Sequence, residues 1–547
     1  MGSVVEGRAR QFSALDETQF DLLVIGGGIT GCGIARDAAL RGLTVALVEK
    51  DDFASGTSSR SSRLIHGGVR YLEHGHLHLV FESSAERRRL LRLAPHLVRP
   101  LEFTWPVYAG ARIPRWKLGA GLMLYDALAM FRNVGRHRRL SRRAVLEHEP
   151  ALRSEGLCGG ASYYDAATDD ARLTLANALG AAEVGAVALN HCVVVEQATA
   201  DGRVTGAIVE DRLTGKRTIV HARAVVSATG PWASATRGSK GAHIAVPRDR
   251  VGNRAALTLL SPTDGRVLFA LPAGPHSIIG TTDTYTTATP DDVRASNEDV
   301  RYLIDSANAF FPAAQLTGDD VVSAWAGIRP LLPAQGDTPG AASREHAVLT
   351  DHRGLISIAG GKLTTYRVMA GDVVDVVAKQ LNRNVGSDRT RSLPLPGGDI
   401  ASLDDVVASA AWATGDPALG THLARSYGSR WVEVWKEIST NEGAARLVDA
   451  LPYTVGEMRY AVHREMACTL GDLLIRRTHL AFETRDHGLA VAQRVAALVA
   501  PLLEWDDDAK RRAIGDYVGE VERVFSIEEA GVEAREPRRA DPSLRSG

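Results

Sequence analysis

The order of apolar and polar positions near the start of the chain predicts a strand–helix–strand unit over residues 21–49. Residues 22–25 form a short, bounded apolar run, which is typical of a buried parallel strand. A helical stretch follows to about Arg41, and a second apolar run at 44–48 is closed by Glu49. Three later runs, separated by Asp-Gly and Thr-Gly turns, also predict strands: 186–195, 204–210 and 218–228.

The pattern changes twice along the chain. Residues 240–350 alternate apolar and polar positions in short runs, which predicts an antiparallel sheet with one helix at 298–310. A last buried strand is expected at 355–359, and a helix from about 363 to 381. After about residue 400 little strand signal is left and helical segments follow one another, at 403–413, 417–427, 443–450, 456–475, 487–504 and 508–524.

Three glycines connect the first strand to the first helix, in the spacing Gly26-x-Gly28-x-x-Gly31. Gly26 permits the tight turn, Gly28 lets the backbone approach a pyrophosphate, and Gly31 lets the helix pack closely on the strand. The amides at the helix start then face the phosphates. Glu49 closes the second strand, where a carboxylate can accept hydrogen bonds from a ribose. We expect a bound dinucleotide here; the motif alone does not choose between NAD and FAD.

Composition excludes some classes of protein. The chain has 547 residues, 64 Lys and Arg against 65 Asp and Glu, and a net charge of −1, so no global attraction to nucleic acid is expected. Its four cysteines form no metal-ligand spacing and fit a reducing compartment, and no metal site is expected. The first twenty residues show no signal peptide, and no apolar run reaches the ~18 residues of a bilayer span.

One region is strongly basic. Residues 87–143 hold fourteen Lys and Arg against two acids, and within them 116–131 is a mostly apolar helix candidate. An apolar helix with basic flanks is suited to an anionic lipid interface. The alternative is a core helix with solvated arginines beside it. Nucleic acid is not expected as a partner, because aromatic residues are not interleaved with the charges.

A series of further motifs follows along the chain. They are SSRSSRLIHGGVRYLE at 58–73, DDARL at 169–173, ATGPW at 228–232, SKGAH at 239–243, IIGTTD at 278–283, GIRPL at 327–331, GGKLTTYR at 360–367, ExRY at 457–460, DLL at 472–474 and RRT at 476–478. Together these motifs resemble those of one family, the FAD-dependent, quinone-linked glycerol-3-phosphate dehydrogenases, in the family's order. The resemblance covers roughly residues 20–480.

The resemblance implies an α/β fold: an FAD-binding, Rossmann-like domain of the glutathione-reductase type, an inserted antiparallel-sheet substrate domain, and an all-α C-terminal domain. We expect the FAD domain to be discontinuous (19–95, 155–240 and 352–390) and the substrate domain to combine 96–154 with 241–351. The helical domain is expected at 398–527, after a flexible leader at 1–18 and before a disordered tail at 528–547.

The resemblance also implies the site. FAD is expected as the cofactor, held by Gly26, Gly28, Gly31, Glu49, Thr57, Ser58, Ser59, His66, Gly67, Gly68, Gly230, Gly361, Lys362, Leu363 and Thr364. The expected substrate, glycerol 3-phosphate, needs cations for its phosphate. Arg344 and Lys362 are candidates for the phosphate and Arg329 for the C2 oxygen, with Arg70 and Tyr71 closing the pocket.

The expected reaction oxidises sn-glycerol 3-phosphate to dihydroxyacetone phosphate, and the electrons pass to a membrane quinone. His243 is the preferred general base, with His66 as the alternative, because an imidazole titrates near neutral pH. An oxidase that reduces O₂ and a related flavin amine or hydroxy-acid oxidase are the rival enzymes. A non-catalytic flavin- or lipid-binding protein and a soluble NAD-linked dehydrogenase are disfavoured. A homodimer is expected, in the cytoplasm and attached peripherally to the inner face of the cell membrane.

Overall fold

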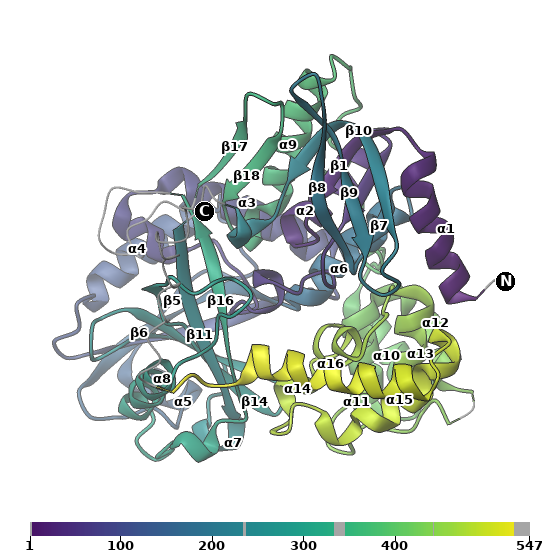
Figure 1. The fold of residues 1–547 in the computed structure, drawn as a ribbon. Coiled ribbons are helices and arrows are strands. Elements are labelled where there is room, and N and C mark those ends of the chain that lie inside the picture. The colour runs from purple at the N-terminus through teal and green to yellow at the C-terminus, as the bar shows by residue number, and fades with distance from the viewer. Residues whose placement is uncertain (1–2, 234–236, 333–344, 441, 530–547) are drawn as a thin grey trace, which may run out of the picture.

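The computed structural model describes residues 3–233, 237–332, 345–440 and 442–529, without the side chains of Arg70, His74 and Arg237. Its architecture is two sheets and a helical domain (Figure 1). The fold class agrees with the prediction: a Rossmann-like FAD-binding domain, a second sheet and a C-terminal all-α domain.

The first sheet contains the predicted strand–helix–strand unit. Its strand order is β17-β18-β10-β1-β2-β7, and β1, β2, β7, β10 and β18 run parallel. A β8–β9 hairpin extends from β10. The strands are β1 (Phe20–Ile25), β2 (Val45–Val48), β7 (Val187–Leu189), β8 (Cys192–Ala200), β9 (Arg203–Asp211), β10 (Arg217–Ser227), β17 (His346–Thr350) and β18 (Ile356–Gly360).

Helices cover one face of this sheet. They are α2 (Ile29–Leu40), α6 (Asp170–Ala182) and α9 (Tyr366–Gln380), and a short 3₁₀ helix, Leu363–Thr365, precedes α9. Apolar side chains of α2, α6 and α9 form one buried cluster with those of β1, β2, β10 and β18. The cluster places the N-terminus of α2 at the carboxyl edge of β1, where a phosphate can meet the free amides.

The opposite face is covered by the β8–β9 hairpin and by α1 (Val4–Glu17). A flexible leader at 1–18 was therefore the wrong expectation for residues 4–17. Ser3 and Glu6 form a capping box, and Phe12 and Leu15 are buried against the sheet. In Figure 1, α1 lies at the right beside β7.

The second sheet is mixed and mostly antiparallel, in the order β15-β11-β14-β13-β12-β4-β6-β3, with β16 on β11 and β5 on β6. The β4–β12 pair is parallel. Its strands are β3 (Leu64–Ile65), β4 (Val98–Tyr108), β5 (Arg138–Leu140), β6 (Leu157–Thr168), β11 (Arg237–Pro247), β12 (Ala256–Leu260), β13 (Val267–Ala273), β14 (His276–Gly280), β15 (Thr284–Tyr285) and β16 (Ser323–Leu331).

Several strands differ from the expected domains. Strand β3 was expected in the FAD domain but pairs with β6 in the second sheet. Strand β6 was expected in the FAD domain but pairs with β4 along eleven positions of the second sheet. Strand β17 was expected in the substrate domain but pairs with β18 in the first sheet. Helices α5 (Arg142–His148), α7 (Arg248–Val251) and α8 (Asn297–Phe310) cover one face of the second sheet. Helices α3 (Leu77–Leu93) and α4 (Arg115–Leu128) lie at its other face.

The C-terminal domain contains α10 (Leu403–Thr414), α11 (Pro417–Tyr427), α12 (Trp431–Ile438), α13 (Val455–Arg464), α14 (Leu480–Glu483), α15 (Leu489–Leu503) and α16 (Asp507–Phe525). The helix expected at 443–450 is absent: Arg446 instead bridges Thr454. The helix expected at 456–475 is divided, since α13 ends at Arg464 and a π-helix spans Asp472–Arg477. Of the tail expected at 528–547, Glu528 pairs with Ser296, and residues 530–547 lie outside the described part.

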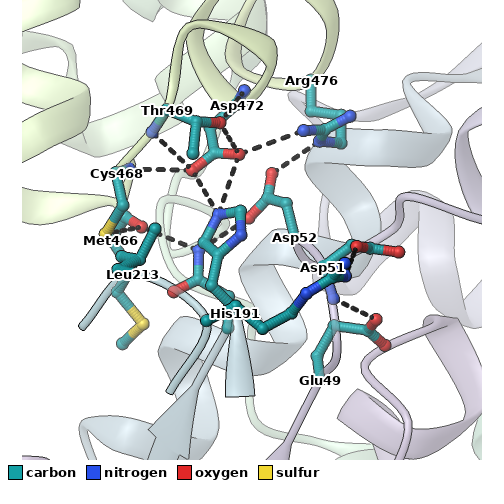
Figure 2. Close-up of polar contacts among 12 residues, drawn as sticks. Glu49, Asp51, Asp52, His191, Leu213, Met466, Cys468, Thr469, Asp472 and Arg476 are labelled. Atoms are coloured by element: carbon teal, nitrogen blue, oxygen red, sulfur yellow. Dashed lines mark hydrogen bonds and ion pairs between the residues drawn. The ribbon is translucent and has the colours of Figure 1, made fainter. Parts of the chain in front are cut away.

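Buried ion pairs join the C-terminal domain to the FAD domain (Figure 2). Asp52, three residues after Glu49, accepts Arg476 Nε at 2.7 Å and Arg477 Nη1 at 2.6 Å. All three side chains are buried, and the Arg477 guanidinium holds the pKa of Asp52 below its ordinary value despite burial. A second buried pair joins Arg172 of α6 to Glu465 at 2.5 Å. The C-terminal domain is thus joined by ion pairs to the loop that follows Glu49.

Asp52, His191 and Asp472 place three potential metal-ligand atoms within 4.8 Å of one another. Their contacts are those of an ion-pair cluster. His191 Nε2 lies 3.0 Å from Asp472, whose carboxylate pairs with Arg476 and accepts the Cys468 amide (Figure 2). Burial acts to lower the pKa of His191, but the adjacent Asp472 carboxylate outweighs it and raises this pKa above its ordinary value.

Candidate active site

A cavity of about 600 Å³ is lined by residues of both sheets. The first sheet contributes the ends of β1, β2, β10 and β18, and the second contributes β4, β6, β11, β13 and β16. Its size is within the range of sites that enclose a small-molecule ligand. The predicted cofactor site, from the glycine motif, and the predicted substrate site, from the later motifs, therefore line the same cavity.

The glycine motif forms one end of this cavity, where Gly26 and Gly28 line it. Gly26 has φ +109°, and a Cβ there would lie 2.7 Å from the Ala228 carbonyl oxygen. Gly31 does not line the cavity: a Cβ on it would lie 1.9 Å from the Gly26 carbonyl oxygen. Gly31 thus allows α2 to pack closely on β1.

Glu49 also lines this end. Its carboxylate accepts the Gly27 amide at 2.6 Å and the Asp51 amide at 2.9 Å, which fixes its orientation. Burial raises its pKa above the ordinary value, while the two amides act in the opposite direction. Gly230, expected near the cofactor, lines the same cavity.

The Ser- and Thr-rich loop follows along one wall. Thr57 and Ser58 line the cavity. The Thr57 hydroxyl donates to the Ile328 carbonyl of β16 at 2.6 Å, and Ser58 Oγ accepts the Ile29 amide at the start of α2 at 3.0 Å. Ser59 is buried and does not line the cavity, so the structure does not bring it to the expected cofactor contact.

His66 and Gly68 belong to the segment 64–71, here called the flavin loop, and line the other end. The Thr364 hydroxyl accepts the His66 amide at 3.2 Å, which joins the flavin loop to the start of α9. Gly67 does not line the cavity, and its amide donates to Asp165 at 3.0 Å. Gly361, Lys362, Leu363 and Thr364 line the cavity beside this loop. The Gly361 amide donates to the Glu345 carbonyl at 3.1 Å.

His243 of β11 is buried at the cavity wall. Its Nε2 lies 2.8 Å from Ser62 Oγ, and its ring stacks on Trp325 at 5.5 Å. Its Nδ1 has no hydrogen-bond partner among the described residues. A Cβ on Gly280 would lie 2.2 Å from the ring, so this glycine provides the space for the imidazole.

Burial, together with the nearby guanidinium groups of Arg329 and Arg63, lowers the pKa of His243 to about 3. The imidazole is therefore neutral at physiological pH. It does not titrate near neutral pH, which was the reason for preferring it as the base, and it stays the candidate because it lines the cavity unprotonated.

This pKa predicts an acid-dependent loss of stability. Between pH 6.5 and 3 the unfolded chain binds a proton at His243 and the folded chain does not, so the free energy of unfolding falls as the pH falls. The expected slope from this residue is about 1.4 kcal/mol per pH unit. Urea unfolding at several pH values checks it: His243→Asn should reduce the slope by this amount, and an unchanged slope would contradict the assignment.

Arg329 of β16 lines the cavity near His243. Its Nη1 donates to Asp283 at 3.1 Å and its Nη2 to the Thr281 hydroxyl at 3.0 Å. A Cβ on Gly241 would lie 2.4 Å from the guanidinium, so Gly241 leaves space for it. Arg329 is thus held at the wall as a fixed positive charge.

Lys362 and Tyr71 meet at the same end. The ammonium group of Lys362 lies 3.9 Å from the centre of the Tyr71 ring and donates to Ser83 Oγ at 3.2 Å. Both residues line the cavity. Arg344 and the Arg70 side chain, also predicted there, lie outside the described residues.

The sequence interpretation missed several lining residues. Arg60 lines the cavity, its guanidinium has no hydrogen bond or ion pair within the described part of the chain, and burial lowers its pKa to about 10. Asp165 and an aromatic wall also line it, with Phe103, Trp105, Tyr163 and Phe269. The SSRSS stretch could have indicated Arg60. Asp165 and the four aromatic residues lie in strands without a sequence motif that would mark them as part of a site.

These residues fit FAD. Gly26, where a Cβ would clash with the backbone, forms part of the cradle, the buried Glu49 carboxylate follows β2 where dinucleotide-binding folds hold a ribose, and Arg60 offers a cation to a phosphate. Fold and site define a flavin-dependent oxidoreductase. Residues 21–367 match the family "FAD dependent oxidoreductase", and residues 388–510 match "C-terminal domain of alpha-glycerophosphate oxidase".

Similar proteins narrow the class. "Glycerol-3-phosphate dehydrogenase 2" of Mycobacterium bovis is 39% identical over 94% of this chain and 90% of its own length. The mitochondrial glycerol-3-phosphate dehydrogenase of Macaca fascicularis is 38% identical over 98% of this chain and 77% of its own. The crystal structure of the Bacillus halodurans glycerol-3-phosphate dehydrogenase, complexed with FAD, is 34% identical with a TM-score of 0.79, covering 96% of this chain and 100% of that one. The chain belongs to the FAD-dependent glycerol-3-phosphate dehydrogenase family, and its cofactor is FAD.

Proposed function

We propose that this protein oxidises sn-glycerol 3-phosphate to dihydroxyacetone phosphate on FAD and passes the electrons to a membrane quinone. The observation that carries the proposal is the single cavity in which a neutral buried histidine, two fixed cations and the dinucleotide cradle meet. The names of the relatives support the same substrate.

In this mechanism, bound FAD supplies the acceptor for the hydride that leaves C2 of the substrate. His243 accepts the hydroxyl proton, because its buried imidazole is neutral. Arg329 stabilises the oxygen at C2 as its charge increases, and Lys362 binds the phosphate together with Arg344. Tyr71 and Arg70 close the pocket. Gly26, Gly28, Glu49, Thr57, Ser58, Arg60 and Gly230 would hold the cofactor.

Turnover of the purified, FAD-loaded protein with glycerol 3-phosphate tests this function. We expect rapid reduction of a soluble quinone and little hydrogen peroxide in air. Peroxide at a comparable rate would favour an oxidase, which the match of residues 388–510 to a glycerophosphate oxidase domain makes the second candidate. Turnover of an amine or a hydroxy acid, without turnover of glycerol 3-phosphate, would contradict both.

The proposal includes attachment to a membrane surface. Among the described residues, no helix is both long and apolar enough to span a bilayer. Helix α4 nevertheless exposes apolar side chains along one face, with Trp116 72% exposed and Met123 56% exposed. Beyond its end, Phe131 is 55% exposed, and Arg115 and Arg132 flank this face. An exposed apolar helix face bordered by arginines is suited to the surface of anionic lipid.

The double substitution Trp116→Ser and Met123→Ser is expected to lower partitioning onto anionic vesicles about tenfold or more, because two exposed apolar side chains no longer enter the interface. Co-sedimentation with vesicles measures it. The matched control is Trp412→Ser on α10, where the tryptophan is 87% exposed far from α4 in sequence and should not affect binding. Equal losses in both proteins would contradict a role for α4.

The proposal also includes a homodimer. Analytical ultracentrifugation in detergent, which measures the mass of the protein assembly, tests it.

A further inference from the structure

The flavin loop rests on a buried polar cluster that the proposed chemistry does not use. Its centre is Asp165 on β6, a strand the sequence interpretation had placed elsewhere. One oxygen of this carboxylate, Oδ1, accepts the Gly67 amide at 3.0 Å and the Tyr125 hydroxyl at 2.7 Å, and it pairs with the Arg87 guanidinium. Asp165, Tyr125 and Arg87 are all buried.

The packing at Gly67 is independent evidence for the same contact. A Cβ on Gly67 would lie 2.3 Å from the Tyr125 hydroxyl oxygen and 2.6 Å from Ser84 Oγ. The flavin loop therefore lies directly on α4 and α3, with no space for a side chain between them. Arg87 donates in turn to the Tyr125 hydroxyl at 2.7 Å, so the three groups form a closed ring of contacts.

The loop that this cluster holds carries substrate- and cofactor-facing residues. His66 and Gly68 line the cavity on either side of Gly67, and Tyr71 supports Lys362. Helix α3 contacts both Lys362 and the polar cluster. Ser83 accepts a hydrogen bond from the Lys362 ammonium group, and Arg87 pairs with Asp165. A shift of the Gly67 amide would therefore move the side of the pocket where the substrate phosphate is proposed to bind.

We propose that Asp165, fixed by Arg87 and Tyr125, is a positioning residue that holds the flavin loop in the geometry needed to bind substrate. The inference rests on the proposed function for its kinetic consequence, although the anchoring itself does not depend on the substrate. Burial keeps the pKa of Tyr125 well above its ordinary value, so its hydroxyl stays a donor to the carboxylate throughout the working pH range.

Tyr125→Phe tests the proposal, because it removes one hydrogen bond from Asp165 and keeps the shape and the Arg87 pair. Two readouts are expected to change. Hydrogen exchange of the amides in 64–71, measured by mass spectrometry on the FAD-loaded protein, should accelerate roughly tenfold. The KM for glycerol 3-phosphate should rise by a similar factor, with kcat changed less than threefold.

Tyr427→Phe is the matched control. Tyr427 is also buried and also donates to a carboxylate, Glu457 at 3.0 Å, but it lies in the C-terminal domain and does not line the cavity. We expect a similar loss of thermal stability in both variants and faster exchange at 64–71 in Tyr125→Phe alone. Unchanged exchange in Tyr125→Phe, or an equal increase in both variants, would overturn the proposal.

Asp165→Asn is a second variant. It retains an oxygen for the Gly67 amide but leaves Arg87 without its buried counter-charge, so the loop should exchange faster than in Tyr125→Phe. If Asp165→Asn does not fold, Tyr125→Phe still decides the question. If the wild-type protein does not oxidise glycerol 3-phosphate, the proposed function fails, and the exchange measurement still tests the anchor by itself.

Discussion

Replacing His243 by asparagine is expected to lower kcat for glycerol 3-phosphate by about 10²–10⁴-fold, the usual contribution of a positioned general base. Asparagine can still hydrogen-bond to Ser62, but it cannot accept the hydroxyl proton. The buried imidazole, with its pKa near 3, is unprotonated at every pH at which turnover would be measured. Stopped-flow reduction of the bound flavin by substrate measures the affected step directly.

His96→Asn is the control for this experiment. His96 is another buried histidine whose pKa is lowered to about 3 by burial, and it does not line the cavity. We expect this variant to retain the wild-type rate of flavin reduction. A His243→Asn variant that reduces flavin within threefold of the wild-type rate would show that another group takes the proton, and His66, which faces the same cavity, would be tested next.

Asp52→Asn is expected to cost about 3–5 kcal/mol of unfolding free energy, because it removes the carboxylate that pairs with Arg477 and one of the three that pair with Arg476. Arg476 and Arg477 both contact this carboxylate, and Arg476 also pairs with Glu520 of α16. Since Asp52 follows Glu49 by three residues, the bound cofactor should also dissociate more readily. Urea unfolding followed by fluorescence, with FAD release as a second readout, measures both effects.

Asp508→Asn is the matched control for this substitution. Asp508 pairs with Arg511 on the exposed surface of α16, and an exposed pair contributes only about 0–1 kcal/mol. We expect unfolding free energy and FAD retention close to wild type. If Asp52→Asn were as stable as this control, the C-terminal domain would not depend on the buried pairs for its attachment.

The parts of the fold with strong local patterns could be predicted from the sequence. The apolar run at 22–25, the three glycines and Glu49 together indicate one supersecondary unit, and the structure contains it as β1, α2 and β2. Each part of that unit depends on residues within about thirty positions of one another. Local sequence patterns predict such strands and helices well, because the contacts that stabilise them are themselves local.

Elements stabilised by distant contacts were not predicted. Helix α1 looked like a polar leader because only two of its side chains, Phe12 and Leu15, are buried, and both pack on a sheet formed later in the chain. The Ser3–Glu6 capping box was the local signal available. The eight-residue helix expected at 443–450 is too short to be stable from propensity alone, and a bridge between Arg446 and Thr454 replaces it.

The same distinction applies to the site. His243, Arg329 and Lys362 lie in motifs, and the structure brings all three to one cavity. Asp165 and Asp52 were not identified, because their roles depend on partners far away in the sequence, Arg87 and Tyr125 for one and Arg476 and Arg477 for the other. A single carboxylate in a strand or loop has no spacing pattern from which its distant partners could be predicted.

The most direct test of the central claim is anaerobic mixing of the FAD-loaded protein with glycerol 3-phosphate while the flavin absorbance near roughly 450 nm is recorded. The proposed function predicts bleaching with glycerol 3-phosphate and none with glycerol, because Lys362 and Arg344 are proposed to bind the phosphate. A flavin that stays oxidised with glycerol 3-phosphate would contradict the proposed function. The assignment of the fold and of FAD would not change.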